Sequence, residues 1–360
     1  MAEHIIDYLA KYGDVTFDEL PFGEVDALIL SQFSYLKLEN VIPRLKVHSE
    51  ALSMAEIADK MEEAEVFSDE RYEQDNRALW QGMMSGRRFG TMSCNYLADE
   101  TDDTIAVQFC AFTVFLQGYM PIILFRGTDE TIVGWKEDFN MAFAKPIPGQ
   151  RMALMYVNQV SLRLDGEFTI AGHSKGGNFA VYSAMAAAGD VRERIASVYS
   201  FDGPGFRSEI LEENHYAEIA DKISKYIPKS SLVGLILENS EDYEVVNSSV
   251  VGGALQHNPY TWLVDDTAFT RLDDVHLGAK VRNQSLNQWV NDLSEGQLQV
   301  LVDSLFHVIE AAGVETTTEI SADMKKSAMN MIKATADIDD ETRKQLKVVI
   351  KALFSALMSM

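Results

Sequence analysis

The sequence predicts an α/β fold in which a mostly parallel sheet is flanked by helices, with a helical region appended at the C-terminal end. Three observations indicate this class. Short apolar segments of strand length alternate with helical segments, which is typical of parallel sheets buried on both faces. A glycine-rich turn at residues 172–177 joins one such strand to a helix. Strand-like segments cease near Thr270, and helical patterns follow.

The bulk composition is that of a folded globular protein. The chain has 360 residues, of which 47% are hydrophobic and 24% are charged. This length suits one large decorated domain or two domains. We expect an N-terminal helical and loop segment packed on the core, an α/β core, and a C-terminal helical region, at residues 1–88, 89–269 and 270–360.

The N-terminal segment mixes helical and loop patterns. Residues 26–36 are apolar enough to be buried, and residues 51–65 carry a helical mixture of Ala, Met, Ile and Glu. No pattern associated with catalysis occurs before residue 85 or so. We therefore expect no chemistry from this part of the chain.

The predicted core begins with a β-hairpin and continues as alternating strands and helices. The hairpin covers residues 91–116 and turns at the acidic residues 99–103. Glycine and proline signals bound the elements that follow. These are a strand at 121–125, a helix at 152–164, a strand at 167–171, a helix at 178–188 and a strand at 195–201.

Three helical segments are predicted beyond residue 270. Ser294 and Gln297 have the spacing of a capping pair, and Asp339 or Asp340 can cap the last helix, at residues 341–358. This helix carries Lys344, Lys347 and Lys351 beside apolar residues, which is compatible with membrane-surface contact. On an acidic protein, packing in the core or in a homo-oligomer through these C-terminal helices is the favoured interpretation.

Charge and terminal features exclude several classes of function. The formal net charge is −24, from 55 acidic and 31 basic side chains, so nucleic acid is an unsuitable partner. The N-terminus lacks the pattern of an export signal, and no segment is apolar enough for a membrane span, so we expect a cytoplasmic protein. Cys94 and Cys110 lack disulfide or zinc spacing, and we expect both to be buried.

The residues from Gly172 to Gly177 read Gly-His-Ser-Lys-Gly-Gly between a strand and a helix. A serine hydroxyl becomes a good nucleophile only when a base removes its proton, and hydrolases expose such a serine on a sharp strand-to-helix turn. Gly172 and Gly176 stand two residues before and two after Ser174, where they permit that turn. Ser174 is the predicted nucleophile. The alternative is a glycine-rich turn that serves only close helix–strand packing.

The same turn offers a place for negative charge. The backbone N–H of Lys175 lies at the start of the predicted helix, where unpaired donors can hold a developing oxyanion. A second donor should come from the loop after an earlier strand, and Thr128 follows the strand that ends at Phe125. An ordinary strand-ending turn is the alternative for Thr128.

These motifs together resemble the class 3 lipases. The resemblance rests on Phe125-Arg126-Gly127-Thr128, on Trp135 and Asp138 at WxxD spacing, and on the 172–177 turn, and it covers about residues 89–260. It implies an α/β-hydrolase fold and activity on acylglycerols or related esters. A bacterial family of uncharacterised lipase-like proteins, with GHSKGGN, DGPG and QH blocks, is more similar still. The resemblance implies that Ser174 is the nucleophile, Thr128 and Lys175 are oxyanion donors, and Trp135 and Asp138 support the oxyanion loop.

A histidine late in the chain must act as the base, because α/β-hydrolases follow the order serine, acid, histidine. Of the seven histidines, His257 alone follows a late strand-like segment and a flexible Gly252-Gly253 pair. We therefore predict that His257 is the base; the alternative is an ordinary solvated loop histidine. His215 lies in a charged helix, and the remaining histidines lie too early, inside the turn or in the helical region.

The acid departs from the class 3 pattern. That family has an aspartate before a Val-Pro pair, whereas residues 226–231 here contain no carboxylate. Asp202 ends the strand after the nucleophile's helix, where pancreatic-type lipases take their acid, and we predict that it orients the imidazole. Asp202 could instead be only a turn residue before Gly203-Pro204-Gly205. The fallback acids are Glu238, Asp242 and Glu244.

The sequence thus predicts a serine hydrolase that cleaves small-molecule or lipid carboxylic esters through a Ser-His-Asp triad, without metal or organic cofactor. A peptidase or thioesterase could use the same residues, because fold and triad do not determine the substrate. The alternative from another class is a catalytically silent hydrolase-fold protein that acts as a binding or scaffold module. The missing acid at residues 226–231 favours that alternative.

Overall fold

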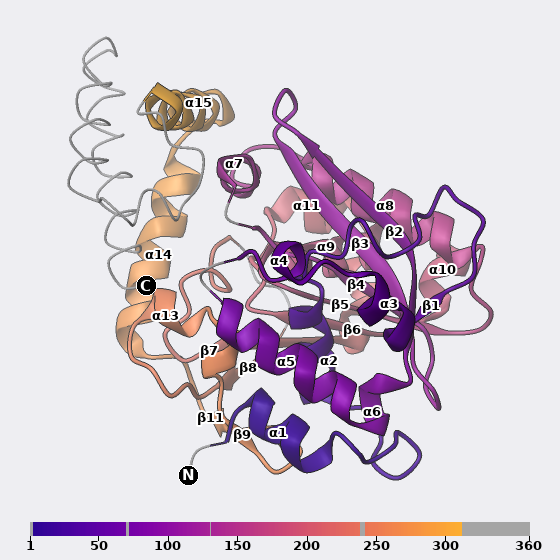
Figure 1. Ribbon diagram of the computed structural model, residues 1–360. Coiled ribbons are helices and arrows are strands. Elements are labelled where there is room, and N and C mark those ends of the chain that lie inside the picture. The colour runs from indigo at the N-terminus through magenta and orange to yellow at the C-terminus, as the bar shows by residue number, and fades with distance from the viewer. Residues whose placement is uncertain (1–2, 70–71, 130, 238–241, 312–360) are drawn as a thin grey trace.

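A large mixed sheet forms the centre of the computed structural model, which describes residues 3–69, 72–129, 131–237 and 242–311 (Figure 1). Within these residues the sheet has nine strands, and β4 to β8 run parallel. The strands β1 to β4, and β11 on β8, pair antiparallel. In spatial order they are β1 (Leu52–Ser53), β2 (Ser93–Asp102), β3 (Val107–Phe115), β4 (Ile122–Phe125), β5 (Phe168–His173), β6 (Ile195–Phe201), β7 (Ile223–Pro228), β8 (Tyr243–Val246) and β11 (Arg271–Leu272). A separate ribbon pairs β9 (Val264–Asp265) with β10 (Ala268–Phe269).

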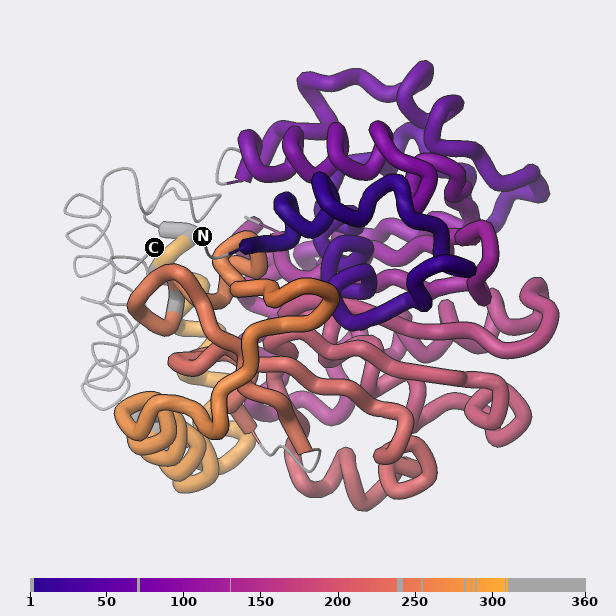
Figure 2. The backbone as a smooth tube through the Cα atoms, turned by 90° about the horizontal axis from the view of Figure 1, so that it is seen from below, coloured from indigo at the N-terminus to yellow at the C-terminus, as the bar shows by residue number. Residues whose placement is uncertain are grey.

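Helices cover both faces of the sheet, as the apolar strands require. Along β4, Ile122 and Leu124 pack into the cluster beneath the N-terminal helices, whereas Ile123 and Phe125 pack with the helices of the other face. Figure 2 shows the N-terminal part of the chain layered on one side of the strands. That layer contains α1 (Ile5–Tyr12), α2 (Glu24–Phe33), α3 (Met54–Lys60), α4 (Glu63–Val66), α5 (Glu73–Ser85) and α6 (Arg87–Gly90). The opposite face carries α8 (Pro148–Ser161), α9 (Lys175–Ala186) and α10 (Gly189–Glu193).

A buried ion pair holds the N-terminal helices together. Arg88 donates to both carboxylate oxygens of Asp26, at 2.7 and 2.6 Å, and Tyr8 donates to the same carboxylate at 3.0 Å. The Arg88 and Asp26 side chains are 0% and 1% exposed. The guanidinium also lies 4.1 Å from the ring centroid of Phe17. These contacts tie α1, α2 and α6 into one layer.

The connection from β6 to β7 is a helical crossover made of α11 (Ser208–Glu213), α12 (Tyr216–Ile219) and the 3₁₀ turn η1 (Ala220–Lys222). After β8 come α13 (Gly253–Gln256) and η2 (Pro259–Thr261), which carry the chain back across the ends of the parallel strands. A mostly parallel sheet with helices on both faces and a strand–turn–helix at its centre is the α/β-hydrolase fold. The predicted fold class is therefore confirmed.

Two helices follow the sheet, α14 (Leu277–Asp292) and α15 (Glu295–Ala311). The predicted capping pair is confirmed, because Ser294 and Gln297 exchange hydrogen bonds of 2.9 and 3.3 Å between side chain and backbone. Helix α15 packs on α7 (Ile132–Asn140): Phe139 and Phe306 meet edge to face with centroids 5.7 Å apart, and Lys136 lies 3.9 Å from Asp303. The predicted last helix lies outside the described residues.

The last strand of the described residues, β11, pairs with β8 through Arg271 and Leu272, in keeping with the expectation that strands cease near Thr270. One expectation about local structure was wrong. The acidic residues 99–102 belong to β2 rather than to the turn, since their side chains lie toward the exposed tip of the hairpin, where charge is tolerated. No helix among the described residues is long and apolar enough to cross a membrane.

Candidate active site

Ser174 stands on the sharp turn between β5 and α9. Its backbone has φ 57° and ψ −131°, a conformation that a residue with a side chain rarely adopts. The Ser174 N–H donates to the carbonyl of Phe201 at 2.8 Å, which holds the turn against the end of β6. The strained turn therefore presents the Ser174 side chain beyond the carboxyl ends of the parallel strands.

The glycines around Ser174 allow the backbone to pack closely. A Cβ on Gly172 would lie 2.3 Å from the backbone of Gly176, and a Cβ on Gly176 would lie 2.2 Å from the carbonyl oxygen of Phe125. Neither contact is possible for a residue with a side chain unless the backbone moves. Strand, turn and helix can thus meet only because these two positions are glycine.

His257 and Asp202 complete a continuous chain of hydrogen bonds with Ser174. His257 Nε2 lies 2.9 Å from Ser174 Oγ, and His257 Nδ1 lies 2.6 Å from Asp202 Oδ2. A carboxylate can only accept, so Nδ1 carries the proton and Nε2 has a free lone pair for the serine hydroxyl. This tautomer is the one in which the imidazole can take the Ser174 proton.

Asp202 is fully buried and fully partnered. Its backbone has φ 48°, and its N–H donates to the carbonyl of Tyr226 at 2.8 Å. Oδ1 accepts hydrogen bonds from Ser231 Oγ at 2.5 Å and from the N–H of Gly234 at 3.0 Å, which leaves Oδ2 for His257. The structure therefore brings together Asp202 and His257, which lie 55 positions apart in sequence.

Gln256 fixes the loop that carries His257. Its buried side chain accepts from the N–H of Ser230 at 2.9 Å and donates to the carbonyl of Val250 at 2.8 Å. Its carbonyl accepts from the indole of Trp262 at 2.8 Å. These bonds explain why a glutamine precedes His257: the Gln256 side chain fixes the backbone to which the histidine is attached.

A second histidine supports the first. His173 Nε2 donates to the backbone carbonyl of His257 at 2.9 Å, and Tyr35 Oη lies 2.9 Å from His173 Nδ1. Burial lowers the pKa of His173 well below its ordinary value, and the neighbouring His257 acts in the same direction, so His173 is neutral. Since Nε2 is the donor, Nδ1 must accept the phenol proton. Tyr35 thereby holds His173 in the tautomer that anchors the base.

Thr128 follows a glycine that packs against the Ser174 turn. The preceding residue, Gly127, packs so closely on the turn that a Cβ there would lie 2.6 Å from the His173 carbonyl and 3.1 Å from Ser174 Cβ. The Thr128 hydroxyl donates to Asp138 Oδ2 at 2.7 Å. Lys175 begins α9, so its N–H has no carbonyl in a preceding helical turn to bond.

Helix α7 carries both residues expected to support the oxyanion loop. Trp135 and Asp138 lie on it and are partly exposed, but Oδ1 of Asp138 is inaccessible and makes no hydrogen bond within the described residues. Burial raises the pKa of Asp138 to about 6, and the Lys175 ammonium opposes that rise. Asp138 thus binds the Thr128 side chain through Oδ2.

Two of the fallback acids and two of the other late histidines have surroundings of their own. Glu244 is exposed and pairs with Arg271, Asp242 is exposed, and Glu238 lies outside the described residues. His215 bonds Glu218 at 2.8 Å. His276 caps α14, accepting from the N–H of Gly278 at 3.2 Å.

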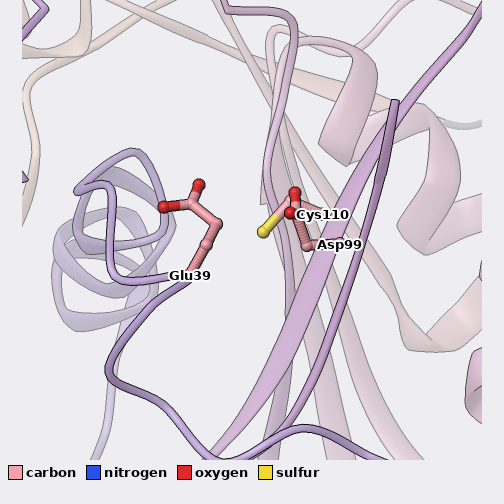
Figure 3. A group of neighbouring side chains, drawn as sticks. All are labelled: Glu39, Asp99 and Cys110. Carbon is pink, nitrogen blue, oxygen red and sulfur yellow. The ribbon is translucent and has the colours of Figure 1, made fainter. Parts of the chain in front are cut away.

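A separate group of possible metal ligands occurs on the antiparallel side of the sheet. Ligand atoms of Glu39, Asp99 and Cys110 lie within 4.8 Å of one another (Figure 3). The buried Arg126 guanidinium pairs with Glu39 and supplies the positive charge there. Burial raises the pKa of the Cys110 thiol to about 12, so it remains protonated at neutral pH. This donor set favours the guanidinium over a metal ion. Cys94 is likewise a buried free thiol.

Sequence reasoning missed Tyr35 and Ser231, which bind His173 and Asp202. Tyr35 comes from the segment in which no chemistry was expected, and Ser231 comes from the stretch that lacks the lipase acid. Neither residue lies in a recognisable motif.

The comparisons with known proteins identify a family and include a lipase among the similar solved structures. The family model described as Mbeg1-like matches residues 83–307. The crystal structure of M37 lipase is similar to this chain at 16% sequence identity, with a TM-score of 0.36, over 59% of this chain and 70% of the lipase chain. No curated protein matches the chain.

Proposed function

The chain belongs to the Mbeg1-like family, and from its geometry we propose that it is a serine hydrolase that cleaves carboxylic esters through an acyl-enzyme. The observation that carries this proposal is the continuous chain Ser174–His257–Asp202, with separations of 2.9 and 2.6 Å. Serine, base and orienting acid in this order are the components of nucleophilic acyl transfer.

In the proposed reaction His257 Nε2 takes the proton from Ser174 Oγ as the oxygen attacks the ester carbonyl. The carbonyl oxygen becomes an oxyanion, which the backbone N–H groups of Lys175 and Thr128 stabilise, since the Thr128 hydroxyl already donates its proton to Asp138. Collapse of the tetrahedral intermediate expels the alcohol, which receives the proton from His257. Water, activated by the same imidazole, then attacks the acyl-serine, and Ser174 and the carboxylic acid are released. Asp202 keeps the imidazole in the required tautomer throughout.

The alternative function is a catalytically silent binding or scaffold module, which the absence of a carboxylate in residues 226–231 favours. The bond between Asp202 and His257 argues against this alternative. Asp202, which follows β6, supplies the carboxylate for His257, and Ser231 donates a hydrogen bond to that carboxylate. Burying a carboxylate and its hydrogen-bonded partners costs desolvation free energy, so such a group is unexpected in a protein that does not use it.

A fluorophosphonate probe tests the proposal. We expect the wild-type protein to be labelled covalently and Ser174→Ala not to be labelled. A series of p-nitrophenyl esters of graded chain length then measures activity and the size of the acyl site together. A correctly folded wild-type protein that neither reacts with the probe nor hydrolyses any ester of the series would overturn the proposal.

A further inference from the structure

A buried ion pair lies behind the oxyanion side of the site. Lys175 Nζ is 2.8 Å from Glu137 Oε2, and both side chains are 0% exposed. The ammonium has three protons, and it makes three hydrogen bonds, the others to the carbonyl and the side-chain oxygen of Gln108 at 3.0 and 2.9 Å. Lys175 directly follows Ser174, and these bonds fix the end of its side chain to Gln108 in β3.

Glu137 connects the same point to two further elements. Its Oε2 also accepts from the N–H of Gln108 at 3.1 Å, and its Oε1 accepts from the N–H of Gly149 at 2.8 Å. Through one carboxylate, β3, α7 and the beginnings of α8 and α9 are joined. A Cβ on Gly149 would lie 2.4 Å from Glu137 Oε1, so only glycine at this position lets α8 approach the carboxylate this closely.

Both candidate oxyanion donors are attached to this cluster. Lys175 supplies one through its own backbone N–H, while its side chain is bound to Glu137. Thr128 supplies the other, and its hydroxyl is held by Asp138, the residue next to Glu137 on α7. The elements that carry the two donors are thus connected through Glu137 and Lys175.

Stability does not explain this arrangement. Burying two charges has a desolvation penalty that their attraction barely offsets, and apolar residues of similar volume are commonly as stable or more so. Such a pair can instead fix the positions of neighbouring groups. This matters for catalysis, because a misplacement of a catalytic group by about 1 Å can lower the rate about 100-fold.

We propose that Glu137 and Lys175 are a positioning pair that sets the spacing of the oxyanion donors. The proposal rests on the proposed hydrolase function, since it assigns these residues a part in the same reaction. Neither side chain contacts the reacting atoms. The pair acts through the Lys175 N–H on one side and through Asp138 and Thr128 on the other.

Glu137→Gln is the first test, because it retains size and an acceptor oxygen but removes the charge. We expect kcat for p-nitrophenyl ester hydrolysis to fall about 10- to 100-fold, with KM within about threefold, since oxyanion contacts strengthen in the transition state. The rate of fluorophosphonate labelling should fall by a similar factor. Asp26→Asn breaks the equally buried Arg88–Asp26 pair, and it should lower stability while leaving kcat within about twofold.

A double variant keeps the test decisive if the single one fails to fold. Glu137→Met with Lys175→Met removes both charges, so we expect a folded protein of near wild-type Tm whose kcat is still reduced at least about 10-fold. A folded double variant with wild-type kcat would overturn the positioning role. So would a loss of kcat in Asp26→Asn equal to that in Glu137→Gln. Failure of the wild-type protein to react with probe or ester contradicts the hydrolase function itself and is recognised before any variant is made.

Discussion

Ser231 donates a 2.5 Å hydrogen bond to the carboxylate of Asp202. The loop after β7, where class 3 lipases have their acid, thus contributes a hydroxyl here, while the carboxylate comes from the end of β6. The two loops together surround one carboxylate. Its carboxylate is bound on Oδ1 by Ser231 and Gly234 and on Oδ2 by His257.

Asp202→Asn should abolish most of the activity. An amide at this position can present its NH₂ group to His257 and favour the wrong tautomer, so we expect kcat to fall about 10³- to 10⁴-fold. Steady-state ester hydrolysis checks this result. Glu244→Gln is the control, because Glu244 is exposed and pairs with Arg271 away from the site, and it should retain wild-type kcat. Wild-type turnover in Asp202→Asn would remove Asp202 from the mechanism.

Ser231→Ala should have a smaller effect of the same kind. Asp202 Oδ1 keeps its bond from the N–H of Gly234 but loses the one from the hydroxyl. We therefore expect kcat to fall about 10- to 100-fold, corresponding to a lost hydrogen bond to a charged group. Ser231→Thr retains the hydroxyl and should recover part of the rate. Equal rates for the alanine and threonine variants would contradict a role for this hydrogen bond.

Tyr35→Phe should weaken catalysis from a position outside the triad. Without the phenol, His173 Nδ1 has lost its donor, and the ring that anchors the His257 carbonyl is free to change tautomer. We expect kcat to fall about 3- to 10-fold, in line with a buried hydrogen bond of about 1 kcal/mol. Tyr226→Phe is matched to it, because it removes a phenol bonded to Glu24, remote from the base. A larger effect of Tyr226→Phe on kcat would contradict the prediction.

Asp138→Asn should change how stability depends on pH. The pKa of Asp138, raised by burial to about 6, exceeds that of an unfolded aspartate, so the folded protein binds this proton more tightly. Ionisation therefore destabilises the fold above about pH 6, by up to about 3 kcal/mol, and the penalty disappears below about pH 4. The Tm of the variant relative to wild type should rise between these values in thermal scans. A difference that does not vary with pH would refute this assignment.

Zinc or cadmium should not stabilise the protein through Glu39, Asp99 and Cys110. A metal would have to displace the Arg126 guanidinium and deprotonate a thiol whose pKa is about 12. We expect the Tm to be unchanged by either ion, and both cysteines to react with a thiol reagent only after unfolding. A metal-dependent rise in Tm that Cys110→Ala removes would contradict this view of the site.

How far the site could be predicted from the sequence depended on how local each feature is. Ser174 and its glycines form one turn, so their spacing alone predicts the geometry. His257 could be found because few histidines follow a late strand. Asp202 was one of four candidate acids, since its contact with His257 spans 55 positions and depends on how two loops meet. Tyr35 lies 138 positions from His173, and no local pattern records that contact.

The fold was predictable for a similar reason. Strands buried on both faces are continuous apolar runs, and β4, β5 and β6 could be recognised from them. The two-residue strands β1 and β11 are too short to show an alternating hydrophobic pattern. They are recognised as strands only by their pairing with β2 and β8. The hydrophobic pattern of a segment predicts which of its side chains are buried. It predicts less well which distant segment of the chain packs or pairs with it.

Helix α7 has a consequence for how this protein can be controlled. Glu137 and Asp138 face the oxyanion side, while Lys136 and Phe139 meet α15. Under the proposed positioning role, a ligand that displaced α15 would disturb the helix that carries Glu137 and Asp138 without reaching Ser174. Substrate binding and the docking of α15 would then be coupled reciprocally, because whatever free energy the docked helix adds to substrate binding, bound substrate adds to the docking of the helix.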